Sequence, residues 1–278
     1  MAKAKINGYT DAVLAYQKAE AGKRPAATLQ KMADMLVRSG KEVFDKAAGE
    51  NIQVEVTAYE PAQGKSRENG LIGKADIRVN GSVTIRDVSL YERETPDGIH
   101  FPSVSFPAYK DRSGEWHDFI TGVSREVRAL TAEAIIKADT YCVATGQKTI
   151  DAIKSAGAEA KEVWYDVRTY KAREDARVEG MASIRIEPHE GAEKSLFTIN
   201  NVRIRKSDRG YYYSQMPSVR KGAEFEDVVA FPGNTAAFVN NIVVADFKKN
   251  HVEKAVEEAV ERANKTAPAP ELGPERGH

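Results

Sequence analysis

Basic and aromatic side chains gather in the segment 195–221, and their chemistry suits contact with nucleic acid. The segment has one acidic residue, Asp208, and its cations are Arg203, Arg205, Lys206, Arg209, Arg220 and Lys221. Phosphate groups bind such cations when they share a surface, and Tyr211 or Tyr213 offers a ring on which an unpaired base can stack. A solvated strand face with packing tyrosines explains the same residues, because charged outer faces are common on antiparallel sheets.

The apolar residues of this segment predict the strand pair that displays the cations. They alternate, shift by one residue and then alternate again, at Phe197, Ile199, Val202 and Ile204. A period of two indicates a half-buried strand, and a one-residue shift that keeps apolar side chains on one face indicates a β-bulge. Arg203 and Arg205 then project from the opposite face. Residues 206–210 are typical of a turn and residues 211–213 of a returning strand, so we expect a hairpin.

Two further pairs of cations are candidates for the same contact. Arg125 and Arg128 lie three residues apart, so they share one face of the helix that Ser124 is expected to cap. An exposed arginine pair on an amphipathic helix is more often a solvated face than a binding surface. Lys110 and Arg112 lie in a polar loop that would extend the surface of the basic segment, although loops of this kind are usually plain connections.

The sequence predicts no catalytic centre, metal site or cofactor. The histidines at positions 100, 117, 189 and 251 stand far apart and show none of the short spacings that place two metal ligands together. Cys142 is the only cysteine, which excludes a disulfide framework and a thiolate cluster. No paired carboxylates and no nucleophile beside a base stand out, so we expect a non-catalytic protein.

Composition restricts where the protein works and how it binds. Lysine and arginine number 41, as do aspartate and glutamate, so a nucleic-acid contact must come from local clusters rather than from a basic chain. No apolar run approaches the ~20 residues that span a bilayer, and residues 1–14 lack the apolar core of a secretory signal. A cytoplasmic protein with no membrane contact is the expectation.

The pattern of the basic segment has an earlier counterpart in the chain. The same alternation and the same shift occur at Val83, Ile85, Val88 and Leu90. Further matches are Ala75, Ile77 and Val79 with Ala182, Ile184 and Ile186; Gly98 with Gly210; Phe106-Pro107 with Met216-Pro217; and Trp116 and Asp118 with Phe225 and Asp227. The landmarks keep their order over a period of roughly 110 residues, which is too long for a solenoid repeat and suits a small domain. The sequence therefore predicts an internal duplication.

We expect an α+β protein with two tandem domains. A helical arm over residues 1–50 precedes a first domain at 51–142, and a helical linker at 143–160 precedes a second domain at 161–247. Strands of the first domain are expected at 53–59, 74–80, 82–92, 99–106 and 116–120, with a helix after Ser124. Residues 248–278 are expected to form an amphipathic helix and a disordered tail rich in proline.

The order of these landmarks in both copies resembles the septation protein SpoVG family. The residues that carry the resemblance in the first copy are Ala75, Ile77, Val79, Val83, Ile85, Val88, Leu90, Gly98, Phe106, Pro107, Trp116, Asp118 and the helix start Ser124-Arg125-Glu126. Those in the second copy are Ala182, Ile184, Ile186, Phe197, Ile199, Val202, Ile204, Gly210, Met216, Pro217 and Ser218. No single motif is diagnostic, but their shared order is. The two copies cover about two-thirds of the chain.

The resemblance implies a function and a way of pairing. SpoVG-like proteins are small bacterial cytoplasmic regulators that dimerise and bind DNA and, in some members, RNA. A tandem chain then implies an intramolecular pseudo-dimer, and the family's contacts at the helix start carry over to Arg125 and Arg128. The second copy departs here, because residues 234–238 contain no arginine.

A second class of function fits the same sequence. In this alternative the chain is a protein-interaction or assembly module, and its sheet edges and amphipathic arms at 25–48 and 252–263 bind partner chains or further copies of itself. Net neutrality and the missing arginines of the second helix start favour this alternative.

Overall fold

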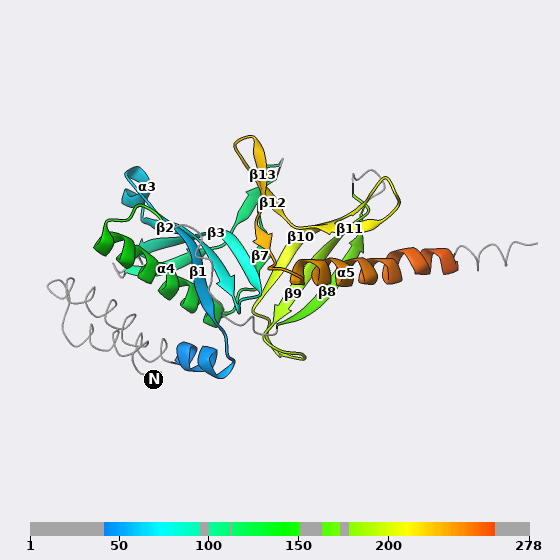
Figure 1. Ribbon diagram of the computed structural model, residues 1–278, viewed down its shortest axis with the longest axis horizontal. Helices are drawn as coiled ribbons and strands as arrows, with labels where there is room; N and C mark the ends of the chain where they lie inside the picture. Colours follow the sequence, from blue (N-terminus) through cyan, green and yellow to red (C-terminus); the bar gives the residue numbers. More distant parts are fainter. Residues whose placement is uncertain (1–41, 95–99, 112, 151–162, 173–177, 259–278) are drawn as a thin grey trace, which may run out of the picture.

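The fold is α+β and is built mostly from antiparallel strands (Figure 1). The computed structural model describes residues 42–94, 100–111, 113–150, 163–172 and 178–258. The predicted N-terminal arm therefore lies mainly outside the described residues, and its last part is helical over residues 42–49. The predicted C-terminal tail also lies outside them. Among the described residues, no helix combines the length and the apolarity needed to cross a bilayer.

The first sheet uses the strands that the alternation predicts in the first half. It begins with the edge strand β1 (Val54–Pro61), followed by β2 (Leu71–Val79) and β3 (Val83–Glu94), and β4 (His100–Ser105) pairs with the later part of β3. The helix α4 (Arg125–Thr145) packs against β1, β2 and β4. Apolar side chains at the alternating positions of β2 and β3 are fully buried, so one face of this sheet belongs to the core.

The second sheet is built from later residues, and a helix packs against it as well. Its order is β11 (Tyr212–Gln215), β10 (Phe197–Lys206), β9 (Gly180–Glu187) and β8 (Trp164–Lys171). The helix α5 (Thr235–Phe247) packs against β8 and β11 and continues into a π-helical turn, η1 (Lys248–Glu253). Figure 1 shows the two sheets side by side, with α4 in front of one and α5 in front of the other.

The predicted β-bulges are present in both sheets. The register of β10 against β9 shifts between Ile199 and Val202, and that of β3 against β2 shifts between Ile85 and Val88. Asn201 and Asp87 occupy the corresponding extra positions with φ of 61° and 57°. Asparagine and aspartate tolerate this left-handed conformation better than other residues with side chains. The bulge keeps the apolar side chains on both sides of it in the core.

Two short strands connect the halves in a reciprocal way. The strand β7 (Ile120–Thr121) immediately precedes α4 but pairs with β10 of the second sheet, at Thr198 and Ile199. The strand β14 (Val229–Ala230) immediately precedes α5 but pairs with β3 of the first sheet. Each half therefore completes a sheet of the other, and the buried apolar residues of both halves belong to one cluster.

Two small hairpins complete the described chain. They are β5 (Ala108–Lys110) with β6 (Trp116–Asp118), and β12 (Ser218–Lys221) with β13 (Glu224–Asp227). The hairpin β12–β13 stands between the two sheets in Figure 1. Arg86 of β3 donates to the backbone oxygen of Asp227 at 3.1 Å and forms an ion pair with Glu226 at 3.3 Å. This hairpin therefore fastens the second half to the bulge of the first sheet.

Some predicted elements differ from the observed ones. The prediction of a helical linker at 143–160 is wrong for residues 146–150. Gly146 ends α4 in the left-handed conformation, and Ile150 pairs with Tyr59. A short helix, α3 (Lys65–Glu68), lies between β1 and β2. In the expected amphipathic C-terminal helix, Val252 packs against the core, whereas Val256 is exposed.

Candidate nucleic-acid interface

The hairpin β10–β11 presents arginines and tyrosines on the face opposite the core. Arg205 pairs across the strands with Tyr213, and Arg203 pairs with Gln215. Ile204, between the two arginines, is fully buried, so alternation directs Arg203, Arg205 and Tyr213 away from the core. Tyr213 is 42% exposed, and Tyr211 in the adjoining turn is 72% exposed. The structure thus has the alternation that the sequence predicts for this segment.

The charges of these arginines have no internal carboxylate partner. In contrast, a carboxylate oxygen lies within 3.9 Å of several other guanidinium groups, those of Arg67, Arg78, Arg86, Arg168 and Arg185. Over the described ranges, Arg203, Arg205 and Arg209 form neither an ion pair nor a side-chain hydrogen bond. The Nε atom of Arg205 is buried and lacks a hydrogen-bond partner among these residues. We call Arg203, Arg205, Arg209, Tyr211 and Tyr213 the hairpin surface.

Lys206 lies on the other face of the hairpin. It pairs with Tyr212, and its Nζ atom lies 5.4 Å from the centre of the Tyr212 ring. That ring packs against Phe247 of α5, with ring centroids 5.6 Å apart. Contrary to the expectation that the cations share one surface, strand alternation places Lys206 with Ile204, on the side of the helix.

The last two cations of the segment are held by internal contacts in β12. The Nε atom of Arg220 donates to the backbone oxygen of Gly222 at 3.0 Å. Lys221 forms ion pairs with Asp87 at 2.9 Å and with Glu226 at 2.6 Å. Burial on its own lowers the pKa of Lys221, but the hydrogen bonds to Glu226 and Asp87 outweigh it, and the pKa is raised. Lys221 therefore joins the second half to the bulge of the first sheet.

The start of α4 lies beside the other end of β10. The Oγ atom of Ser124 accepts a hydrogen bond from the backbone nitrogen of Val127 at 3.2 Å, as predicted for an N-cap. The backbone nitrogen of Ser124 donates to the oxygen of Leu196 at 2.8 Å, directly before β10 begins. Because Arg203 and Arg205 lie near the far end of β10, the helix start and the hairpin surface are separate sites.

The predicted cations near this helix differ in their availability. Arg125 is exposed, whereas Arg128 donates to the backbone oxygen of Val104 at 3.2 Å and stacks over Phe106, 5.3 Å from the ring centre. Lys110 is exposed at the end of β5, and Arg112 lies outside the described residues. All three described cations are exposed, but the guanidinium group of Arg128 is engaged by these contacts.

An open hollow of about 610 Å³ adjoins the hairpin surface, and we call it the Asp227 hollow. It lies where β11, the strand β14 and the first turns of α5 meet, and its lining includes Arg205, Tyr213, Met216, Asp227, Phe231 and Asn240. Burial raises the pKa of the Asp227 carboxyl. In the sequence, Asp227 stands out only as a landmark of the predicted repeat, because the hollow forms through long-range packing.

One cluster has the residue types of a metal site. Ligand atoms of Asp111, Glu115 and His117 lie within 4.8 Å of one another on the hairpin β5–β6. Asp111 accepts hydrogen bonds from Ser113 and from the backbone of Glu115, and it contacts His117 at 2.9 Å. These contacts hold the pKa of Asp111 well below its usual range. The cluster is explained by the hydrogen bonds of a tight turn.

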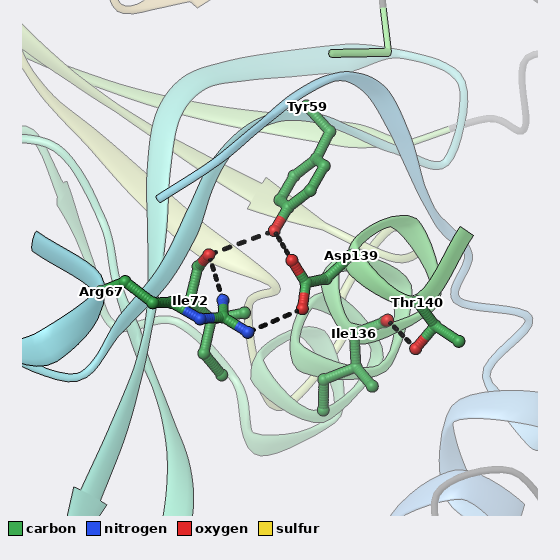
Figure 2. A network of polar contacts seen from close by, with 6 residues as sticks. All are labelled: Tyr59, Arg67, Ile72, Ile136, Asp139 and Thr140. Carbon is green, nitrogen blue, oxygen red and sulfur yellow. Dashed lines mark hydrogen bonds and ion pairs between the residues drawn. The ribbon is translucent and has the colours of Figure 1, made fainter. Parts of the chain in front are cut away.

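A buried polar network is the other place where reactive groups meet (Figure 2). The hydroxyl of Tyr59 donates to Asp139 at 2.8 Å, and Arg67 forms an ion pair with the same carboxylate at 3.1 Å. Burial, followed by the hydrogen bond to Asp139, raises the pKa of Tyr59 far above its usual value. Tyr59 is only 2% exposed, so its hydroxyl cannot reach a ligand, and the network ties α3 and α4 to the first sheet. The nearby thiol of Cys142 is buried as well, and burial raises its pKa.

The chain matches no protein-family model, and no curated protein matches its sequence.

Proposed function

We propose that the protein binds nucleic acid through the hairpin surface and acts as a non-catalytic regulator or accessory factor. The observation that carries the proposal is the set of three arginines without carboxylate partners in the described chain, beside two exposed tyrosines. In a protein with equal numbers of acidic and basic residues, such a patch is a local excess of positive charge. Cations of this kind bind phosphates and release counterions into solution.

The tyrosines favour an unpaired strand over a continuous duplex. Stacking on Tyr211 or Tyr213 requires a base whose face is free, and bases inside a duplex have their faces covered. The arginines supply phosphate contacts of either DNA or RNA, so affinity comes from both charge and stacking. Arg125 and Lys110 provide exposed charges on the other half, and a longer strand would reach them after it leaves the hairpin.

We also propose that the two halves are copies of one SpoVG-type module that form a pseudo-dimer within the chain. Three observations support this: the matching order of strands and helix, the left-handed bulge residues Asp87 and Asn201, and the reciprocal pairing of β7 and β14. In this proposal the copies have divided their roles. The helix start of the second copy carries no arginine, whereas its hairpin carries three, so the second copy binds through the hairpin.

The proposal is tested by removing the three arginines together. We expect the Arg203→Ala, Arg205→Ala, Arg209→Ala variant to bind single-stranded oligonucleotides at least about tenfold more weakly, since each charged contact is worth about 1.5–3 kcal/mol at best. Fluorescence anisotropy over a salt series measures this. If the arginines contact three phosphates, the wild-type log–log slope should be near −2, at about −0.7 per phosphate.

Two controls make this test specific. The matched variant Lys65→Ala, Lys137→Ala, Arg168→Ala removes three cationic side chains, all exposed, from other parts of the surface and should bind like the wild type. The Arg125→Ala, Arg128→Ala variant should lose less affinity than the hairpin variant. Equal losses would contradict the division of roles, and an absence of wild-type binding at low salt would exclude the function.

Assembly through a sheet edge is the second candidate function. The strand β8 ends the second sheet with β9 as its neighbour, and its Trp164 and Tyr170 are 47% and 55% exposed. The corresponding edge of the first sheet, β1, is partly covered by the pairing of Tyr59 with Ile150. On β8 itself, the backbone oxygen of Thr169 contacts His251 at 3.0 Å, so part of this edge is covered as well. The rest of an aromatic edge strand can accept a strand from another chain. A folded sample that binds no oligonucleotide but self-associates in light scattering would favour this candidate.

A further inference from the structure

The Asp227 hollow combines a cation, aromatic rings and a carboxylate in one space. Arg205 and Tyr213 lie at the side shared with the hairpin surface, and Met216 and Phe231 provide apolar lining. Asp227 also lines the hollow, and among the described residues its carboxylate oxygens have no hydrogen-bond donor. The buried Nε atom of Arg205 likewise has no acceptor there. An open hollow with an unsatisfied donor and an unsatisfied acceptor is suited to a polar, flat ligand.

The first half has a hollow made from the matching landmarks. Its volume is about 530 Å³, and its lining includes Phe106, Pro107, Trp116 and Asp118. These residues match Met216, Pro217, Phe225 and Asp227 in the repeat, and Met216 and Asp227 line the Asp227 hollow. The residue before the proline and the aspartate therefore line a hollow in both halves. Each hollow also has a cation in its lining, Lys74 of β2 in the first and Arg205 of β10 in the second.

The charges decide which part of a nucleic acid enters the Asp227 hollow. A carboxylate repels a phosphate, so the phosphates remain with the arginines of the hairpin surface. A base carries no charge, and its faces can pack on Met216, Phe231 and Tyr213. A carboxylate can only accept hydrogen bonds, and its two oxygens suit two parallel donors. Guanine offers two adjacent donors, N1–H and the N2 amino group, on its Watson–Crick edge.

We propose that the Asp227 hollow binds an unpaired guanine, with Asp227 accepting both hydrogen bonds from its Watson–Crick edge. This inference rests on the proposed function, since the hairpin surface must first hold the strand. The hydrogen bonds distinguish guanine from inosine, which lacks the N2 amino group, and from adenine, whose Watson–Crick edge offers one donor group. Asp227 is exposed, so a ligand in the hollow can reach its carboxylate, and partial burial raises the pKa of that carboxyl.

The test compares single-stranded thymidine oligonucleotides that carry one central guanine, inosine or adenine. Anisotropy at fixed low salt should show the guanine strand bound about tenfold more tightly than the inosine strand, the value of one charge-assisted hydrogen bond. Asp227→Asn should reduce that preference to within about twofold, because the NH2 group of the asparagine amide would face one of the two hydrogen-bond donors of guanine. Asp208→Asn is the matched control, since it removes the same charge from the turn of the hairpin and should keep the preference.

A second variant tests the space rather than the carboxylate. Ala236 lines the hollow from the first turn of α5. Ala236→Leu fills part of this space without changing Asp227, so it should lower the affinity for the guanine oligonucleotide towards that for the inosine oligonucleotide. A guanine preference that survives both variants would overturn the inference. The inference would also be overturned if the wild type bound all three oligonucleotides equally. The proposed function would still stand in that case, provided that the triple arginine variant binds them more weakly than the wild type. No binding of any strand would exclude both.

Discussion

Asp87 and Asn201 show how single residues set the geometry of each half. Both adopt a left-handed backbone at the bulge, which is the position where the edge partner of the strand changes. Before the bulge, β10 pairs with β7 of the other half; after it, β10 pairs with its own hairpin strand β11. Asp87 also forms an ion pair with Lys221 of β12. The bulge residue of each half thus lies where its strand changes partners, and in the first half its charge also contacts the second half.

Glu126 gives a prediction about pH. It is 7% exposed, and its carboxylate lies 3.2 Å from the ammonium group of Lys46. Burial raises the pKa of Glu126, but hydrogen bonds and the charge of Lys46 outweigh this effect, so the pKa in the folded protein is lowered. A lowered pKa stabilises the fold above the unfolded-state pKa, and the stabilisation is lost as the pH falls through the folded-state pKa.

Glu126→Gln should therefore reduce the free energy of unfolding at pH 7 and have a smaller effect at pH 3.5. Urea titrations of both proteins at the two pH values measure the difference. Glu133→Gln provides the matched control, because Glu133 lies on the same helix and pairs with Lys137, whose side chain is about half exposed. An effect of Glu126→Gln that is equally large at both pH values would show that the ion pair is not its cause.

At the scale of the element, the Tyr59 network holds α4 on the first sheet. The Tyr59 hydroxyl reaches Asp139 of α4 at 2.8 Å, and its ring fills the space above Gly73, where a Cβ atom would lie 2.3 Å from the hydroxyl. Tyr59→Phe keeps the ring but removes the donor, so unfolding should become about 1–2 kcal/mol easier. Tyr109→Phe, which removes a hydroxyl without a hydrogen bond among the described residues, should cost less in the same urea titration. Equal losses would contradict the role of the network.

The elements divide into those that local pattern predicts and those that it does not. Alternation predicts β2, β3, β9 and β10 and their bulges, because burial of one sheet face imposes a period of two. The N-cap at Ser124 is likewise a local signal. The predicted strand at 116–120 reaches β7 only at Ile120, and the pairing of β7 and β14 escapes prediction because their partners lie in the opposite half. The same reason applies to the site: the outward arginines follow from alternation, whereas the ion pair of Lys221 and the Asp227 hollow require the folded chain.

For the whole molecule, the reciprocal strands imply that the halves unfold together. The chain has two tryptophans, Trp116 in the first half and Trp164 in the second. Variants with Trp116→Phe or Trp164→Phe each leave one fluorescent reporter, and β7, β14 and the Lys221 ion pairs join the two reported regions. Urea unfolding should then give the same midpoint for both reporters and for far-UV circular dichroism.

The control is the stability of each variant. Both indoles are partly exposed, so each single substitution should leave the circular-dichroism midpoint within error of the wild type. Two separate midpoints would mean that the halves unfold independently, which would contradict the proposed pseudo-dimer.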